Sequence, residues 1–185
     1  ATLEVRWATL FHDIGKYETY QVKDRIRYDG HAGASRDIAR RILTRLKFPR
    51  RLIDHVCWIV EHHMIMVPLV TMPVAARRKW FLHEAFPSLL EVFRADAMGT
   101  EPTDLALYNQ IVELYKHDMK AMPVRPAQLL SGRDVMALLQ IRPGQQVGKI
   151  LDALHDAQLS GEIKTKEEAE RWVMEKKKNE GTSIS

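Results

Sequence analysis

Histidine and aspartate side chains stand between residues 12 and 96 at positions that could hold a metal ion. His12 and Asp13 are adjacent, and they are followed by His31, by the pair His62–His63 and by Asp96. Neighbouring residues of a helix point about 100° apart, so the first two side chains cannot face each other but can both reach a cation between them. Imidazole and carboxylate groups together suit divalent transition metals. Such a site requires several helices to converge on one point.

The surroundings of His12–Asp13 distinguish this pair from two further copies, His117–Asp118 and His155–Asp156, which fall in ordinary amphipathic segments. Gly15 is predicted to end the first helix just after the pair. This places both side chains at a helix terminus beside a long loop, with Lys16 as a nearby cation. The pair could also be a plain helix C-terminus whose dipole stabilises a protonated imidazole. The later motifs favour a metal or phosphate role.

The elements that must position these residues are predicted to be helices. Apolar residues recur at spacings of three and four without sustained alternation, so the predicted fold class is all-α. The predicted helices cover residues 3–13, 33–46, 50–63, 74–83, 88–97, 103–121, 131–140, a segment ending at 158 and a segment beginning at 165. Residues 17–33 are predicted to form a loop, whose length favours a functional role. Capping boxes are predicted at Ser131/Asp134 and at Thr165/Glu168.

Length and composition exclude several classes of protein. The chain has 185 residues, of which 45% are hydrophobic and 28% are charged, a balance that excludes wholesale disorder. No apolar run approaches the roughly 20 residues that span a bilayer, so no membrane partner is expected. Cys57 is the only cysteine, which rules out an internal disulfide and favours a reducing, cytoplasmic location. Because the chain begins at Ala1 inside an apolar pattern, we expect a fragment.

A basic segment between residues 36 and 51 gives the strongest charge signal. It carries seven basic residues and one acid, a net charge of +6 in a chain whose formal net charge is +4. Such a run is usually a solvated face, but arginine also suits phosphate contacts, and Arg36, Arg40 and Lys47 are expected on one helix face. Lys149, near a predicted helix N-terminus, could accept a further backbone phosphate. The predicted RNA-binding residues are Arg36, Arg40, Arg41, Arg45, Lys47 and Lys149.

Two other patterns receive structural interpretations. Trp58, Trp80 and Tyr20 are interpreted as packing residues rather than as base-stacking platforms. Residues 144–149 look like a phosphate-binding loop, but their spacing is one residue short of that motif. Ile150 also stands where a Ser or Thr would hold magnesium. Nucleoside triphosphate binding is therefore not expected there.

The order of the motifs resembles that of the HD domain, an all-helical fold of metal-dependent phosphohydrolases. The resemblance rests on residues 11–16, 28–34, 60–64 and 94–97. The first metal of that family would be bound by His12, Asp13 and Asp96. A second metal or a substrate phosphate would be served by His31 and by one of His62 and His63. The family has a further histidine in a preceding helix, and no histidine precedes His12 here, so either truncation removed it or the site is degenerate.

A narrower resemblance is to the bacterial tRNA nucleotidyltransferases, or CCA-adding enzymes, and to the related poly(A) polymerases. It rests on residues 6–16, 30–34, 43–49, 130–135, 142–151 and 161–165. It implies an HD-type helical domain over residues 1–122 and a small helical RNA-contacting tail over residues 126–175. Residues 176–185, which contain a single apolar side chain, are predicted to be disordered.

This resemblance implies a parent enzyme that adds nucleotides to the 3′ ends of tRNA or other RNA, with nucleoside triphosphates and magnesium. In that family a carboxylate pair in an N-terminal head holds two metal ions. No Asp of this chain is followed two residues later by Asp or Glu. We therefore expect the chain to lack the head, to bind tRNA and not to add nucleotides by itself.

The HD resemblance also implies a metal-dependent phosphohydrolase activity, with Mg²⁺, Mn²⁺ or Ni²⁺ as the metal. Its catalytic residues would be His12, Asp13, Lys16 and His31. The metal would activate a bound water, and Lys16 or His31 would neutralise phosphate charge. Two alternatives stay open, namely a stand-alone HD-type nucleotide phosphohydrolase and a non-catalytic RNA-binding helical module.

Overall fold

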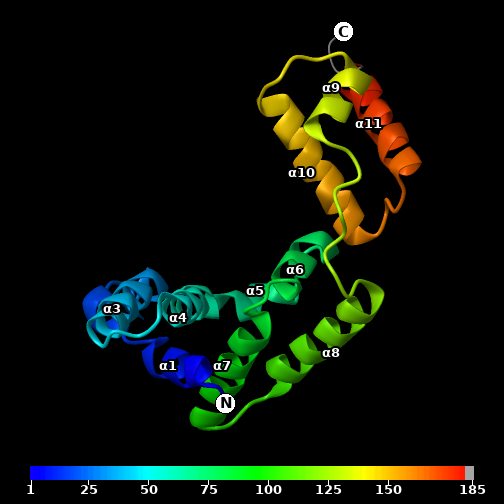
Figure 1. The fold of residues 1–185 in the computed structure, drawn as a ribbon. Helices are drawn as coiled ribbons and strands as arrows, with labels where there is room; N and C mark the ends of the chain where they lie inside the picture. The colour runs from blue at the N-terminus through cyan, green and yellow to red at the C-terminus, as the bar shows by residue number, and fades with distance from the viewer. Residues whose placement is uncertain (182–185) are drawn as a thin grey trace. The chain divides into compact units, whose positions relative to one another are not determined.

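The computed structural model describes the backbone of residues 1–181 and the side chains of residues 1–176. The described part of the chain is mainly helical, with one small two-stranded hairpin, which confirms the predicted all-α class. It forms two compact units (Figure 1). Unit 1 comprises Ala1–Thr71 and His83–His117, and unit 2 comprises Met72–Leu82 and the chain from Asp118 onward. The domain limits predicted from the sequence, 1–122 and 126–175, remain predictions.

Unit 1 is built around the long amphipathic helices that surround α4. Its helices are α1 (Leu3–Phe11), α2 (Lys16–Thr19), α3 (His31–Arg45), α4 (Arg50–His62), η1 (His63–Ile65), α5 (Met66–Leu69), α7 (Phe86–Gly99) and the first part of α8 (Ala106–Ala121). α4 packs against both α1 and α3, and α7 packs against α1 (Figure 1). Val56, Ile59 and Val60 of α4 are fully buried. These apolar residues of the helix predicted over residues 50–63 therefore face the core.

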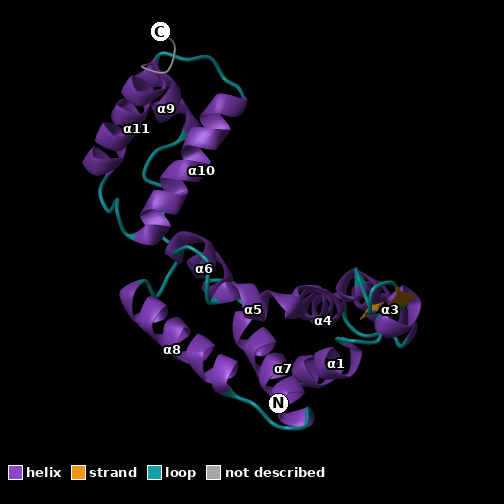
Figure 2. Cartoon of the chain, turned by 180° about the vertical axis from the view of Figure 1, so that it is seen from behind, coloured by secondary structure: helices purple, strands orange, loops and turns teal. Residues whose placement is uncertain are grey.

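The prediction of a loop over residues 17–33 is wrong. Helix α2 covers the first part, and a small antiparallel hairpin follows, in which β1 (Gln21–Val22) pairs with β2 (Ile26–Arg27) (Figure 2). Strands of two residues are too short to produce a period of two in the sequence. α3 also begins two residues earlier than predicted, at His31, because Gly30 turns the chain into it with a left-handed φ of 82°.

Unit 2 contains α6 (Val74–Phe81), α9 (Gly132–Leu139), α10 (Gln145–Ser160) and α11 (Lys166–Gly181). α9, α10 and α11 share a buried apolar core, and α6 packs against α10. The capping box at Ser131/Asp134 is confirmed, since each side chain bonds the other residue's backbone N–H. The box at Thr165/Glu168 is confirmed by the same reciprocal bonds. Of the residues predicted to be disordered, 176–181 lie in α11 and 182–185 lie outside the described residues.

A buried ion cluster lies in unit 2, at residues for which no functional role was predicted. Arg77 Nε donates to Asp118 Oδ2 at 2.9 Å, and Arg78 Nη2 lies 3.4 Å from Asp118 Oδ1. Arg78 Nη1 also donates to the Leu159 carbonyl oxygen at 2.8 Å. The Asp118 side chain is only 1% exposed. The second His–Asp pair of the sequence thus places its carboxylate in a structural cluster.

Within the described part of the chain, no helix is both long enough and apolar enough to cross a membrane.

Candidate functional site

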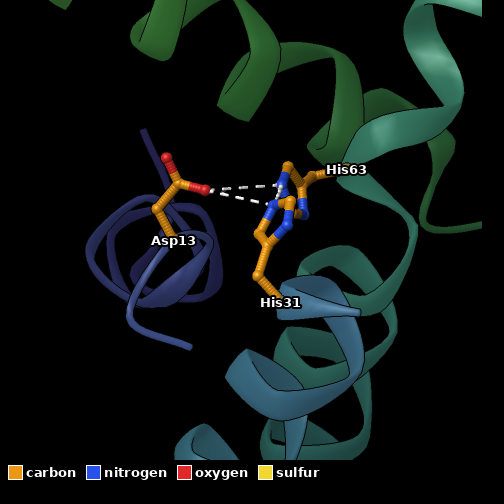
Figure 3. Close-up of side chains that lie close together, drawn as sticks. All are labelled: Asp13, His31 and His63. Carbon is orange, nitrogen blue, oxygen red and sulfur yellow. Dashed lines mark hydrogen bonds and ion pairs between the residues drawn. The ribbon is translucent and has the colours of Figure 1, made fainter. Parts of the chain in front are cut away.

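Asp13, His31 and His63 come together in unit 1 although they lie far apart in the sequence. Asp13 follows α1, His31 opens α3, and His63 opens the short helix η1 that follows α4 (Figure 3). Asp13 Oδ1 lies 3.3 Å from His31 Nε2 and 3.7 Å from His63 Nε2. The two Nε2 atoms are 3.1 Å apart. One oxygen and two nitrogens therefore form a small triangle that could share one ion.

His12 and Asp96 extend this cluster. His12 Nε2 lies 3.4 Å from Asp13 Oδ2 and 3.2 Å from Asp96 Oδ1. The three histidine side chains are only 11–14% exposed, while Asp13 is 35% and Asp96 is 50% exposed. The structure thus brings five of the predicted metal ligands to one place, with the imidazoles inside and the carboxylates nearer solvent.

Backbone carbonyl groups orient all three imidazole rings. The Nδ1 atoms of His12, His31 and His63 lie 2.8, 2.9 and 2.7 Å from the carbonyl oxygens of residues 9, 28 and 60 respectively. A carbonyl oxygen only accepts hydrogen bonds, so each Nδ1 carries a proton and each ring turns its Nε2 atom towards the cluster. The Nε2 atoms of His31 and His63 then face each other across 3.1 Å. At this distance they can share a proton or lie beside a metal ion.

The close approach of α3 to the end of α1 depends on Gly15. A Cβ at this position would lie 2.5 Å from both the His31 carbonyl oxygen and the Ser35 backbone nitrogen. The Gly15 N–H instead donates to the buried Ser35 hydroxyl at 2.8 Å. This contact sets the first turn of α3 against the residues that follow His12, which brings His31 to Asp13. From the sequence, Gly15 was predicted only to end a helix.

The pKa shifts of His63 and Asp13 favour the forms in which these two side chains could bind a metal. Burial lowers the pKa of His63, and the neighbouring His12 and His31 lower it further, against the hydrogen bond to the Val60 carbonyl. His63 is therefore neutral over a wider pH range than an ordinary histidine. Burial raises the pKa of Asp13, but the hydrogen bond from Lys16 and the nearby His12 outweigh it, so this pKa lies below its usual value.

Two cavities adjoin the cluster. The larger, of about 600 Å³, is bounded by the cluster, by the cations Lys16, Arg25 and Arg27 and by Tyr28. The smaller, of about 190 Å³, lies against His12, His63 and Asp96 and is otherwise lined by apolar side chains. A phosphate group suits the first cavity and an apolar group the second. Arg25 and Arg27 were not predicted as site residues, because no pattern linked the supposed loop to the cluster.

His62 does not join the cluster. Its Nδ1 lies 2.7 Å from the Trp58 carbonyl oxygen, and its ring packs on the Trp58 ring with centroids 4.6 Å apart. Of the two neighbouring histidines, His63 is therefore the one that faces the cluster. The Trp58 ring also stacks on His83 at 3.8 Å, as expected for a packing residue.

The predicted RNA-binding residues fall into different environments. Arg36 is paired with Asp37 and Glu61, and Arg40 is paired with Asp54. Part of the +6 charge of the segment is thus neutralised by acids, some of them from α4. Those acids could not be assigned to the basic face from the sequence, because the packing of α3 on α4 was not known.

Four further basic residues lie at the surface. Arg41 is 72% exposed and 3.8 Å from a Glu18 oxygen, and Arg45 is exposed at the end of α3. Lys47 does not share a helix face with Arg36 and Arg40, because α3 ends at Arg45 and Lys47 has a left-handed φ of 58°. Lys149 is exposed on the first turns of α10 in unit 2.

Comparisons with known proteins agree along most of the chain. Residues 31–172 match the family model described as "tRNA nucleotidyltransferase domain 2 putative". A CC-adding tRNA nucleotidyltransferase of Thermus thermophilus is 37% identical over 180 residues, which cover 94% of this chain and 40% of that protein. An A-adding tRNA nucleotidyltransferase of Deinococcus radiodurans is 37% identical over 191 residues, covering 95% and 43% respectively. No solved structure matches significantly.

The helical fold agrees with these matches, which are to a second domain of tRNA nucleotidyltransferases and to proteins of that name. The chain belongs to the tRNA nucleotidyltransferase family, which confirms the narrower resemblance drawn from the sequence. It spans about two fifths of the length of these two relatives.

Proposed function

We propose that this chain is the tRNA-binding helical part of an enzyme that adds nucleotides to tRNA 3′ ends. The observation that carries the proposal is the match over 94% of the chain to a protein named as a CC-adding tRNA nucleotidyltransferase. The chain has no Asp followed two residues later by Asp or Glu. Its contribution is therefore binding, while transfer from nucleoside triphosphates requires the Mg²⁺-binding carboxylate pair of a head domain.

The basic surface at the end of α3 is the favoured place for RNA phosphates. Arg41 is largely exposed, and its closest acid lies at the limit of an ion pair. Arg45 and Lys47 are exposed beside it. When arginine and lysine in such positions bind phosphates, counterions are released from the RNA. The affinity therefore falls as the salt concentration rises. Arg36 and Arg40 contribute less, because acids already neutralise them.

The test measures tRNA affinity over a range of salt concentrations for the parent chain and two triple variants. Each phosphate contact contributes about 0.7–0.9 to the slope of log affinity against log salt. Replacing three contacting cations with alanine should thus reduce the slope by about 2. The test variant carries Arg41→Ala, Arg45→Ala and Lys47→Ala. The control variant, of equal charge change in another surface region, carries Arg94→Ala, Lys116→Ala and Lys120→Ala.

An equal loss of slope in both variants would mean that the α3 surface is merely a solvated face. If the parent chain does not bind tRNA at low salt, the proposal itself is wrong. The Asp13 cluster has no part in either measurement, so the two outcomes concern RNA binding alone.

A second candidate function is metal-dependent phosphohydrolysis at the Asp13 cluster. The Nε2 atoms of His31 and His63, turned towards each other by hydrogen bonds from their Nδ1 atoms to backbone carbonyls, favour it. The donor set fits a divalent transition ion, and His12, Asp13, His31, His63 and Asp96 would hold it. When bound, such an ion polarises a phosphoryl oxygen and activates water.

The chain's own residues would position the substrate at this site. Lys16, Arg25 and Arg27 line the larger cavity and can neutralise a phosphate. Asp96, half exposed beside His12, can accept a proton from water. Mg²⁺, Mn²⁺ and Ni²⁺ are the ions to compare, because the site offers both carboxylate and imidazole groups.

The neighbouring histidines provide a matched test. His63→Ala should weaken Mn²⁺ or Ni²⁺ binding by at least tenfold, since even residues that only orient metal ligands contribute that much. His62→Ala should leave the affinity unchanged. Hydrolysis of 2′,3′-cyclic nucleotides should follow the metal affinity in both variants. Equal effects of the two substitutions would exclude the cluster as the metal site.

A further inference from the structure

The segment from α2 through the hairpin carries several exposed aromatic and aliphatic side chains. Tyr17 is 91% exposed and Tyr20 is 53% exposed, while Val22 and Ile26 are 70% and 53% exposed. Large apolar side chains that are exposed together often mark a surface that binds a partner. Tyr20, which the sequence suggested was a packing residue, is therefore half available to a ligand.

The hairpin arranges these side chains on one face. Val22 pairs with Ile26 across β1 and β2. Because side chains alternate along a strand, Tyr20 and Tyr28, two residues beyond each partner, belong to the same face. Their ring centroids are 6.0 Å apart. Together these four residues form a strip, here called the tyrosine strip, that ends at two aromatic rings.

The tyrosine strip borders the cavity of about 600 Å³ described above. A cavity of about 350 Å³ is lined by Lys16, Tyr17, Tyr20 and Tyr28. Lys16 and Tyr28 also line the 600 Å³ cavity, as does Ile26. The two cavities thus adjoin through a shared cation and a shared ring. The Lys16 ammonium lies 5.7 Å from the centre of the Tyr28 ring.

An aromatic cavity next to a cationic one matches the two halves of a nucleotide. Tyrosine rings on a small sheet stack unpaired bases, and adjacent lysine and arginine side chains hold the phosphates. Lys16 is the charged side chain that lines the aromatic cavity, and Arg25 and Arg27 lie beside it. Lys16 is paired with Asp13 and Arg27 with Asp24, so a phosphate would share these two cations with acids. The three cations still suit an RNA strand better than a neutral apolar partner.

We propose that Tyr17, Tyr20 and Tyr28 form a stacking subsite for an unpaired nucleobase of RNA, with Lys16, Arg25 and Arg27 contacting the flanking phosphates. The inference extends the proposed tRNA-binding function from phosphate contacts at α3 to base contacts at the hairpin. It makes the chain able to hold a single-stranded segment as well as a folded RNA. It does not require an ion at the Asp13 cluster.

The test compares two fluorescently labelled strands of equal charge, hexacytidylate and an abasic ribose-phosphate hexamer, binding to the full chain in EDTA. One stacking aromatic contributes a factor of about 5 to 100 in affinity, so hexacytidylate should bind at least about fivefold tighter. The variant Y17A/Y20A should lose this preference. The variant Y17F/Y20F keeps the rings and should retain it, and Tyr108→Ala on α8 should have no effect.

Crosslinking gives a second readout that does not depend on variant folding. Ultraviolet irradiation of the parent chain with hexacytidylate, followed by trypsin, should place the crosslinked nucleotide on the peptide 17–23, which holds two of the three tyrosines. Equal affinity for the two strands, or an unchanged preference in Y17A/Y20A, would overturn the inference. Either result leaves the salt-dependence test of α3 intact, so the two proposals fail separately.

Discussion

In unit 2 the guanidinium groups of Arg77 and Arg78 are buried against Asp118 and a backbone carbonyl. In unit 1 the Nε2 atoms of His31 and His63 face each other across 3.1 Å beside a cavity. Buried opposite charges that satisfy one another hold a fold together, whereas two imidazole nitrogens at this distance need a proton or a metal ion between them. The first arrangement is typical of structure and the second of a binding site.

Three helix beginnings show a related contrast. α9 and α11 of unit 2 begin with capping boxes, which satisfy some of their first backbone N–H groups. α3 of unit 1 begins at His31 after Gly30, with no side-chain cap. The first residue of α3 is a candidate ligand, whereas the first residues of α9 and α11 follow side chains that stabilise the helix.

Removing the carboxylate of the buried ion cluster should have the largest effect. Asp118→Asn leaves two buried guanidinium groups without their counter-charge, which should cost about 3–5 kcal/mol of unfolding free energy. Urea unfolding followed by circular dichroism measures the loss. Glu113→Gln, which breaks an exposed pair with Lys116, should cost less than about 1 kcal/mol. Similar losses in both variants would remove the structural role given to Asp118.

Two glycines in unit 1 should respond with opposite signs. Gly15→Ala forces a Cβ into backbone atoms of α3 and should cost about 1–3 kcal/mol, with a parallel loss of metal affinity. Gly33→Ala on α3 places its Cβ in open space and should stabilise the chain by about 0.5–1 kcal/mol. Thermal unfolding and Mn²⁺ titration distinguish them. If Gly15→Ala binds metal normally, the close approach does not set the site.

The capping box of α9 should have a moderate effect. Ser131→Ala removes the acceptor for the Asp134 N–H and should cost about 1 kcal/mol, measured by urea unfolding. Ser131→Asn restores a capping oxygen and should recover most of the loss. Since unit 1 does not contain this cap, the affinity for Mn²⁺ should be the same in both variants. A changed affinity would contradict the assignment of the candidate metal site to unit 1 alone.

The smallest expected effect is a pH dependence of stability in EDTA. The folded-state pKa of His63 lies below its ordinary value of 6.5, so the unfolded chain binds more protons, and the free energy of unfolding decreases as pH falls below about 6.5. One such group contributes at most about 1.4 kcal/mol per pH unit. His63→Gln should flatten the dependence measured by chemical denaturation, and His62→Gln should not. Identical slopes would contradict the burial of His63 as its cause.

The sequence predicted the helices well because their apolar spacing and their caps are local signals. Ser131 and Thr165 each sit three residues before the acid that completes the box, and such reciprocal bonds need no tertiary contact. The hairpin was missed, since two-residue strands carry no periodicity and only two residue pairs join them. Tyr20 was consequently assigned to packing.

The candidate site was predictable as a set of residues and not as a geometry. The order of motifs indicated His12, Asp13, His31 and Asp96, and the structure brings them together, while their roles remain predictions. The choice of His63 over His62 was left open, because it depends on where α4 ends. The pairing of Arg77 and Arg78 with Asp118 had no local signal at all, since about forty residues separate them.

The groups that orient the three imidazole rings belong to the main chain at residues 9, 28 and 60. Every amino acid supplies the same carbonyl oxygen, so substitutions at those positions leave the ring tautomers in place as long as the local turn survives. Substitutions there can disturb the core packing of Val60 or the aromatic cavity beside Tyr28, but the replacing residue still supplies the carbonyl oxygen that orients a histidine. The orientation of the three histidines therefore does not depend on which side chains residues 9, 28 and 60 carry.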